Sequence, residues 1–197
     1  MQPISGVAPV SSGMAEARPL ELEGLLELRP NRWPDERGFF SEVWREEWLS
    51  NAGVSARFLQ DNHSHSNKRG VLRGLHFQTP PAAQDKLVRV ARGSIFDVAL
   101  DIRSGSATYG RWAGLVISAE AWNQLLIPRG FAHGFVALED DTDVLYKVTA
   151  PYSPEFERTI RFDDPALGID WPVPLAEVLL SPKDQSAPLL AEVETGF

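Results

Sequence analysis

The chain has 197 residues, no cysteine and a formal net charge of -8. Its length suits one domain, and a folded chain of this size buries roughly 70% of the surface that its unfolded form exposes. The missing cysteines exclude disulfides, thiolate metal sites and thiol catalysis, and they agree with a reducing compartment. The acidic excess excludes a general nucleic-acid coat, because binding to the phosphate backbone requires clustered positive charge. A local basic pocket for an anionic small molecule is compatible with this charge.

No stretch approaches the ~20 apolar residues that a bilayer-crossing helix requires. The first residues also lack the charged and apolar regions of a secretory signal, so we expect a cytoplasmic protein without membrane contact. Residues 1–18 are rich in Ala, Ser, Gly and Pro and show no sustained period. They predict a flexible leader, followed by a single domain over residues 19–197.

From residue 39 onward the sequence predicts short strands at close intervals. The alternation is clearest in residues 95–102, where apolar side chains share one face while Asp97 and Asp101 share the other. One short helix is predicted near residues 44–51, where an Asn-Ala-Gly sequence ends it. The predicted strands span residues 39–43, 71–77, 86–91, 95–102, 112–118, 124–127, 133–138 and 144–149.

These elements predict an all-β fold. No stretch alternates strands with long helices, which disfavours a parallel α/β sheet. Regular short strands with little helix instead favour an antiparallel sandwich or barrel, the jelly roll included. After Asp163 the chain becomes rich in proline, so we expect a tail that wraps the surface with short turns.

Residues 60–66 (QDNHSHS) form a dense polar run ahead of the apolar residues 71–77. Such a run is usually a solvated loop. Here an amide, a carboxylate and two imidazoles share one short segment, so we interpret it as a loop that faces a ligand.

A metal site is one interpretation of the histidines. His63 and His65 have a two-ligand spacing on an extended chain, and His133 supplies a third imidazole, as in the two motifs of metal-binding cupins. The glutamate that those cupins place after the second histidine is missing here. Lys68 and Arg69 stand in its place, and cations repel a divalent ion. The pattern therefore disfavours a catalytic metal.

Proton transfer without a metal is the second interpretation. His76 lies inside an apolar strand, and an imidazole titrates near working pH, as a general base requires. Tyr146 shares a strand face with apolar neighbours, and Lys86 opens a strand. Taken singly, these residues are equally typical of a structural histidine, a core aromatic and an exposed edge lysine.

Ordered motifs along the chain carry a family resemblance. Through them the chain resembles the dTDP-4-dehydrorhamnose 3,5-epimerase family, over about residues 21–190. The resemblance implies a cupin-like jelly-roll β-barrel, a dTDP-sugar substrate, a homodimer, and neither a metal nor an organic cofactor. The motifs are residues 35–40 (DERGFF), 60–64 (QDNHS), 71–78 (VLRGLHFQ), 127–135 (IPRGFAHGF), 145–147 (LYK) and 180–184 (LSPKD).

The resemblance also implies roles for single residues. His76 matches the base that removes the C3 and C5 protons, and Asp184 matches its dyad partner. Tyr146 matches the acid that returns a proton on the opposite sugar face, while Lys86, together with Arg73, should face the C4 oxygen. The positions expected to contact nucleotide or sugar are Arg37, Phe40, Glu42, Gln60, Asp61, Asn62, His133, Tyr152, Glu157 and Lys183.

The chemistry supports this division of roles. A proton beside a ketone is weakly acidic, so imidazole needs help from a cation that stabilises the enolate, worth roughly 3–4 kcal/mol per preorganised donor. Inversion requires removal of a proton from one face and its return on the other, which suits groups on opposite walls. Arginine is the natural bidentate ligand of the diphosphate.

Two features depart from a simple pattern. Arg73 and His76 are three residues apart, so a regular strand would place them on opposite faces; we predict a bulge at Gly74. Family members often carry a tyrosine pair where this chain has Pro151 and Tyr152. The sequence leaves open a C3-only or C5-only epimerase, a metal cupin oxygenase and a non-catalytic sugar-nucleotide binder.

Overall fold

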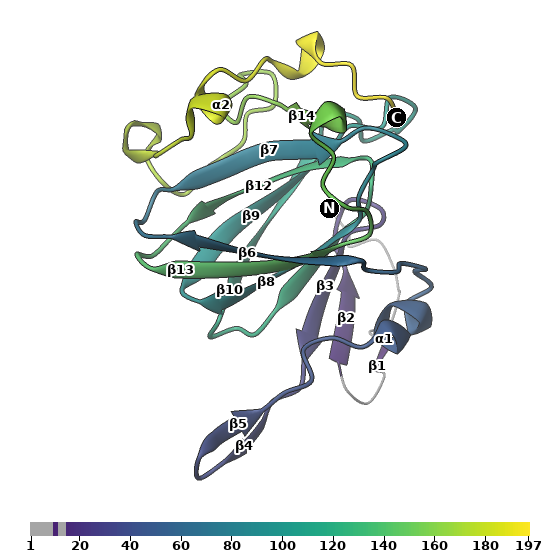
Figure 1. The fold of residues 1–197 in the computed structure, drawn as a ribbon, viewed down its shortest axis with the longest axis vertical. Helices are drawn as coiled ribbons and strands as arrows, with labels where there is room; N and C mark the ends of the chain where they lie inside the picture. The colour runs from purple at the N-terminus through teal and green to yellow at the C-terminus, as the bar shows by residue number, and fades with distance from the viewer. Residues whose placement is uncertain (1–9, 12–14) are drawn as a thin grey trace, which may run out of the picture.

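The computed structural model describes residues 10–11 and 15–197, and two antiparallel sheets dominate it (Figure 1). The seven-stranded sheet has the order β1-β2-β3-β11-β8-β13-β6, and the five-stranded sheet has the order β10-β9-β12-β7-β14. The strands are β1 (Val10–Ser11), β2 (Ala15–Pro19), β3 (Leu26–Pro30), β4 (Trp33–Asp35), β5 (Gly38–Phe40), β6 (Gln60–Ser66), β7 (Leu72–Gln78), β8 (Lys86–Arg92), β9 (Ser94–Asp101), β10 (Trp112–Ser118), β11 (Gln124–Ile127), β12 (Phe131–Ala137), β13 (Thr142–Val148) and β14 (Glu157–Thr159).

Helix is scarce, as the sequence predicted. The described residues contain α1 (Glu46–Asn51), α2 (Pro182–Gln185) and three 3₁₀ turns, η1 (Pro154–Phe156), η2 (Leu175–Glu177) and η3 (Leu190–Glu192). Within the described part of the chain, no helix has the length and apolar character needed to cross a bilayer. The prediction of an antiparallel all-β fold with a few short helices is confirmed at this level.

Most predicted strands agree with the structure. Strands β10 and β11 have the predicted bounds, and β7, β8, β9, β12 and β13 differ by one or two residues at their ends. The predicted strand over residues 39–43 is largely wrong. Only Gly38–Phe40 is extended, and it pairs solely with β4 in a hairpin that projects from the body of the molecule (Figure 1).

The prediction of a flexible leader over residues 1–18 is corrected by the structure at residues 15–18, which lie in strand β2. Strand β2 pairs antiparallel with β3 through register partners that include Ala17 and Leu28. Both side chains are buried in one apolar cluster. A flexible leader is therefore wrong for residues 15–18, and residues 1–9 and 12–14 lie outside the described residues.

The core lies in three layers. Apolar residues such as Val88 and Ile117 fill part of the space between the sheets. The C-terminal segment covers the outer face of the five-stranded sheet, where Trp171 packs in the same cluster as Val98. Leu49 of α1 covers the outer face of the larger sheet. Because these contacts supply the apolar burial, part of the space between the sheets can hold polar side chains.

Candidate active site

A cavity of about 740 Å³ opens between the two sheets. Strand β7 of the smaller sheet forms one wall, and β6, β8 and β13 of the larger sheet form the other. Most of the sequence-predicted site residues line it together: His76, Tyr146, Lys86, Asp184, Gln60, Asn62, Arg73, His133, Tyr152 and Glu157.

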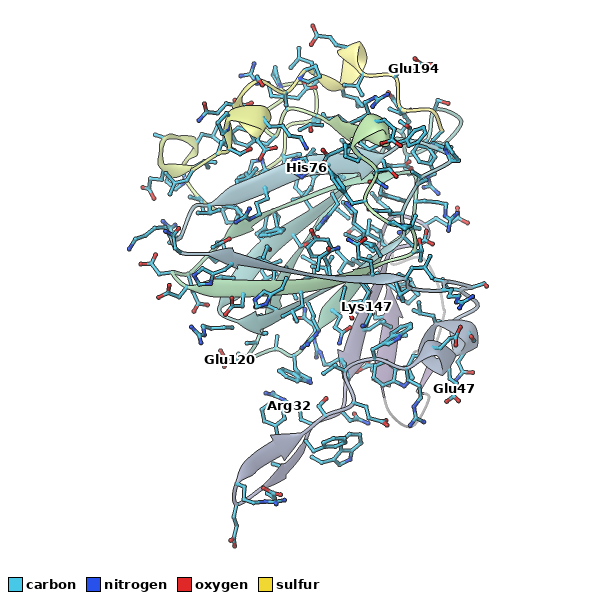
Figure 2. The ribbon with its side chains drawn as sticks, in the orientation of Figure 1. Arg32, Glu47, His76, Glu120, Lys147 and Glu194 are labelled. Atoms are coloured by element: carbon cyan, nitrogen blue, oxygen red, sulfur yellow. The ribbon has the colours of Figure 1, made fainter. Side chains whose placement is uncertain are left out.

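His76 and Asp184 form a hydrogen-bonded dyad. His76 lies on β7 (Figure 2), and its Nε2 is 2.6 Å from Asp184 Oδ1. Asp184 is buried in α2, where the Ser181 hydroxyl donates to its other oxygen at 2.9 Å. Burial raises the pKa of Asp184, but the bonds from His76 and Ser181 outweigh it, and the net pKa lies below its usual value. An ionised Asp184 selects the imidazole tautomer whose Nδ1 carries the lone pair.

A bulge brings Arg73 and His76 into the same cavity, as predicted. His133 pairs with His76 and Phe135 pairs with Arg73, so one residue of β12 opposes two of β7. The φ of Gly74 is +131°. A Cβ at this position would collide with the Cα of Gly134 in β12. Only glycine fits here, and the shift in register places both polar side chains on the cavity side.

Tyr146 and Lys86 face the dyad from the larger sheet. They lie on the neighbouring strands β13 and β8 and line the same cavity as His76. Burial raises the pKa of Tyr146, which keeps its hydroxyl protonated. Burial lowers the pKa of Lys86 to about 8, and its Nζ donates to the His76 carbonyl at 3.2 Å. The cavity therefore holds a base, a phenol and a cation.

His133 forms a second buried pair with Asp97. Its Nε2 is 2.8 Å from Asp97 Oδ2, and Asp97 is fully buried. Burial lowers the pKa of His133 despite the opposing effect of the carboxylate. Asp97 was not among the predicted site residues. Its placement on the polar face of an otherwise apolar strand was the signal that could have identified it.

Glu157 organises one part of the cavity rim. It accepts hydrogen bonds from Tyr152 at 3.0 Å and from Lys183 at 2.6 Å. Burial raises the pKa of Glu157, but these two partners outweigh it and leave a net decrease. Lys183 does not itself line the cavity. It instead holds Glu157 and ties α2 to β14.

The polar segment 60–66 is strand β6, so the prediction of a loop is wrong. Gln60, Asn62 and Ser64 line the cavity, and Ser64 was missed from the sequence. Asp61 points to the other face, where it bonds with Lys147 at 2.9 Å. The predicted contact of Asp61 with substrate is therefore not supported within its own chain. A strand with one face on a polar cavity and the other on solvent carries no hydrophobic alternation.

The three histidines of the metal interpretation lie apart. His63 and His65 lie on the outer face of β6 and each contacts Asp143 Oδ1 at 3.0 Å. His133 instead faces the cavity with Asp97. Among residues 10–11 and 15–197, the structure forms no cluster of three or more His, Asp or Glu side chains suited to a metal ion.

Three predicted residues in the DERGFF motif or just after it lie away from this cavity. Arg37 is 89% exposed and bonds with Asp35, and Phe40 is 67% exposed on the projecting hairpin. Glu42 bonds with Arg45 at 2.7 Å. None of the three predicted residues lines the cavity of its own chain.

The fold and the cavity define a class of protein. A histidine–aspartate dyad, a phenol on the opposite sheet and a buried amine suit an isomerase that moves protons on a bound substrate. The profile described as dTDP-4-dehydrorhamnose 3,5-epimerase matches residues 19–192. The chain belongs to this epimerase family, and the prediction of an epimerase is confirmed.

Individual relatives agree with this assignment. A dTDP-4-dehydrorhamnose 3,5-epimerase of Sinorhizobium fredii is 51% identical over 170 residues, which cover 86% of this chain and 87% of that protein. The structure of the Legionella pneumophila 3,5-epimerase in complex with dTDP-4-keto-L-rhamnose is similar with a TM-score of 0.87 and 45% identity, covering 91% of this chain and 95% of that one. The structure of a 3'-monoepimerase of Streptomyces bikiniensis in complex with dTDP-quinovose is similar with a TM-score of 0.82 and 37% identity. The match covers 88% of this chain and 87% of that one.

Proposed function

We propose that this chain inverts C3 and C5 of dTDP-4-dehydro-6-deoxy-D-glucose and yields dTDP-4-dehydro-L-rhamnose. One observation carries the proposal. His76, which pairs with Asp184, and Tyr146 belong to different sheets yet line one cavity, with Lys86 beside them. The ligand named for the Legionella structure is the product of this reaction, and the activity named for the Sinorhizobium relative supports the same sugar.

Deprotonation is the first step. Nδ1 of His76 takes the proton from C3 or C5, and the electron pair of the broken C–H bond forms an enolate with its charge on the C4 oxygen. Asp184 stabilises the resulting imidazolium. The ammonium of Lys86, aided by Arg73, stabilises the enolate oxygen.

Reprotonation on the opposite face completes the inversion. The Tyr146 hydroxyl donates its proton to the carbon and the enolate returns to the ketone. The phenolate then regains a proton from solvent, and the His76 imidazolium releases its proton to solvent. A raised pKa suits this role because the phenol is protonated when the enolate forms. A single residue would mostly return the proton to the face from which it came.

The rest of the cavity suits a dTDP group. Arg73 has a buried Nε without a hydrogen-bond partner among the described residues, and it offers donors to a phosphate or to the C4 oxygen. Gln60 and Asn62 bond to each other at 2.8 Å and present amides to the cavity. Tyr152 is half exposed at the rim and offers a ring for stacking on base or sugar.

We also propose that the enzyme is a homodimer whose hairpins act across the subunits. Arg37 and Phe40 match nucleotide-contacting positions of the family, yet they lie on a hairpin away from their own cavity. A second copy related by a two-fold axis would let each hairpin reach the other's cavity. The exposed rings of Trp33 and Phe39 would then also be covered.

Four expectations from the sequence stay predictions. They are the closure of the two sheets into a complete jelly-roll barrel, a Pro-rich tail that wraps the surface, a cytoplasmic location and a single domain over residues 19–197.

Solvent deuterium tests the reaction directly. The purified protein is incubated with dTDP-4-dehydro-6-deoxy-D-glucose in heavy water, and the label is located by NMR. Label at both C3 and C5, together with the L-configured product, is the expected result. No label at either carbon would overturn the proposal and favour a non-catalytic sugar-nucleotide binder.

A C3-only epimerase is the second candidate, favoured by the similarity to the Streptomyces bikiniensis 3'-monoepimerase. The same base and acid serve one centre or two. Label confined to C3 would identify this activity. A C5-only enzyme would label the other carbon alone, and stoichiometric iron or manganese by elemental analysis would point to the metal oxygenase.

A further inference from the structure

The hairpin of β4 and β5 is anchored to the body of the molecule by one aromatic side chain. Trp122 lies in the turn between β10 and β11, and its ring meets the ring of Phe39 edge-on with 4.9 Å between the centroids. The guanidinium of Arg32 lies 5.3 Å from the Trp122 ring and 5.5 Å from the Phe39 ring. One residue from each leg of the hairpin therefore packs on the same indole.

Hydrogen bonds reinforce this anchor. The indole Nε1 of Trp122 donates to the Ser41 hydroxyl at 2.9 Å, and Ser41 donates to the Asn31 carbonyl at 2.7 Å. Arg32 donates to the Glu120 carbonyl at 3.0 Å; Figure 2 shows both residues where the hairpin leaves the body of the molecule. These contacts fix both legs relative to the β10–β11 turn.

Trp122 occupies an unusual conformation for its type. Its φ is +58°, in the left-handed region that bulky residues rarely adopt. Glycine would adopt it freely. A tryptophan here retains its ring contacts at a local conformational cost, which indicates that the ring itself has a use.

We propose that Trp122 is a positioning residue, which holds the β4–β5 hairpin at the angle at which Arg37 and Phe40 contact the nucleotide in a second copy. This inference rests on the proposed function and on the proposed contribution of each hairpin to its partner's cavity. Trp122 touches no reacting atom. It acts through Phe39, Arg32 and Ser41 on Arg37 in the turn of the hairpin and on Phe40 at the other end of β5.

The first variant is Trp122→Gly, which removes the ring and leaves a residue that accepts the left-handed backbone. Asp141→Gly is the matched control, because Asp141 has a φ of +52° in an exposed turn on another part of the surface. Loss of the ring contacts should raise the Kd for dTDP and the KM about ten-fold, with kcat changed less than about two-fold. The control should leave all three constants unchanged.

A double-variant cycle separates positioning from general destabilisation. Once Arg37→Ala and Phe40→Ala have removed the two side chains expected to contact the nucleotide, Trp122→Gly should change the Kd for dTDP by less than about two-fold. An additive loss would overturn the proposal. If Trp122→Gly fails to fold, Arg32→Ala, which keeps both rings, enters the same cycle with the same expectations.

The outcomes distinguish the two proposals. A wild-type protein that neither labels the sugar nor binds dTDP contradicts the proposed function. A wild-type protein that does both, while Trp122→Gly has unchanged Kd and KM, contradicts the positioning role alone. A fall in kcat with constant KM would also contradict it, because the hairpin would then not act through binding.

Discussion

His76 and Asp184 are 108 residues apart in sequence, yet their side chains approach to 2.6 Å. The dyad forms because the C-terminal segment docks on β7. Leu179 exchanges backbone hydrogen bonds with Leu72 and Gly70 at the start of that strand, and α2 follows directly. Docking of the tail therefore both covers the apolar sheet face and completes the base.

Replacement of Asp184 tests the dyad. Asp184→Asn should lower kcat on the order of 10³-fold, because an amide that donates to Nε2 favours the imidazole tautomer with a protonated Nδ1. Binding of dTDP should change little. Asp163→Asn is the control, since Asp163 is a carboxylate of the same segment that pairs with Arg161 away from the cavity. Equal losses in the two variants would argue against a catalytic dyad.

Removal of the Tyr146 hydroxyl should separate exchange from inversion. In Tyr146→Phe the base still removes a proton and can return it to the same face, so deuterium should enter the sugar while the L-product forms at least about 10²-fold more slowly. NMR on one sample measures both quantities. Tyr109→Phe, at an exposed tyrosine outside the cavity lining, should behave as wild type. Parallel loss of exchange and inversion would contradict the assigned role.

The lowered pKa of Lys86 predicts an alkaline limit to activity. Lys86 is protonated below its pKa of about 8, so kcat should fall as pH rises through that value. The arginine in Lys86→Arg stays charged at alkaline pH, so this variant should not show the fall of kcat near pH 8.

The free energy of unfolding should rise over the pH range in which kcat falls. The folded pKa of Lys86 lies below the ordinary value, so the unfolded chain binds more protons between about pH 8 and 10.5. The free energy of unfolding should therefore rise as the pH increases across that range, because Lys86 is then neutral in the folded chain and still protonated in the unfolded chain. Chemical denaturation at each pH therefore separates true loss of catalysis from unfolding, and a coincident loss of both would contradict the assignment.

The bulge at Gly74 predicts a severe effect of one added methyl group. Gly74→Ala should lower the free energy of unfolding by about 3 kcal/mol, because the Cβ meets the β12 backbone in a conformation that alanine disfavours. Gly105→Ala is the control, since open space surrounds a Cβ at that glycine. The control should change the free energy of unfolding by less than about 0.5 kcal/mol. Urea denaturation measures both, and a tolerated Gly74→Ala would contradict the close packing.

Complementation tests the transfer of hairpins between subunits. A His76→Ala dimer and an Arg37→Ala, Phe40→Ala dimer should each be impaired. After unfolding and refolding as an equal mixture, half of the dimers are mixed and one of their two cavities is intact, so about a quarter of wild-type activity should return. No gain over the separate samples would indicate that each hairpin serves its own chain or none.

The pattern of short strands and the motifs around His76 and Tyr146 predicted the antiparallel fold and the polar groups of the cavity. Alternation agreed with the structure in β9, where Val98 and Leu100 lie in one apolar cluster while Asp97 and Asp101 lie on the other face of the strand. It failed at β6, where both faces are polar and Asp61 could not be distinguished from its cavity-facing neighbours.

Residue identities and their order along the chain determined the chemistry that is available: an imidazole, a phenol, an amine and a carboxylate. Only the tertiary structure decided which of them meet. The pairing of Asp97 with His133 depends on contact between two strands that are far apart in sequence. Arg37 lies away from the cavity of its own chain because it belongs to a projecting hairpin. Local propensity carries no information about such distances, because they are set by how the sheets and the tail pack together.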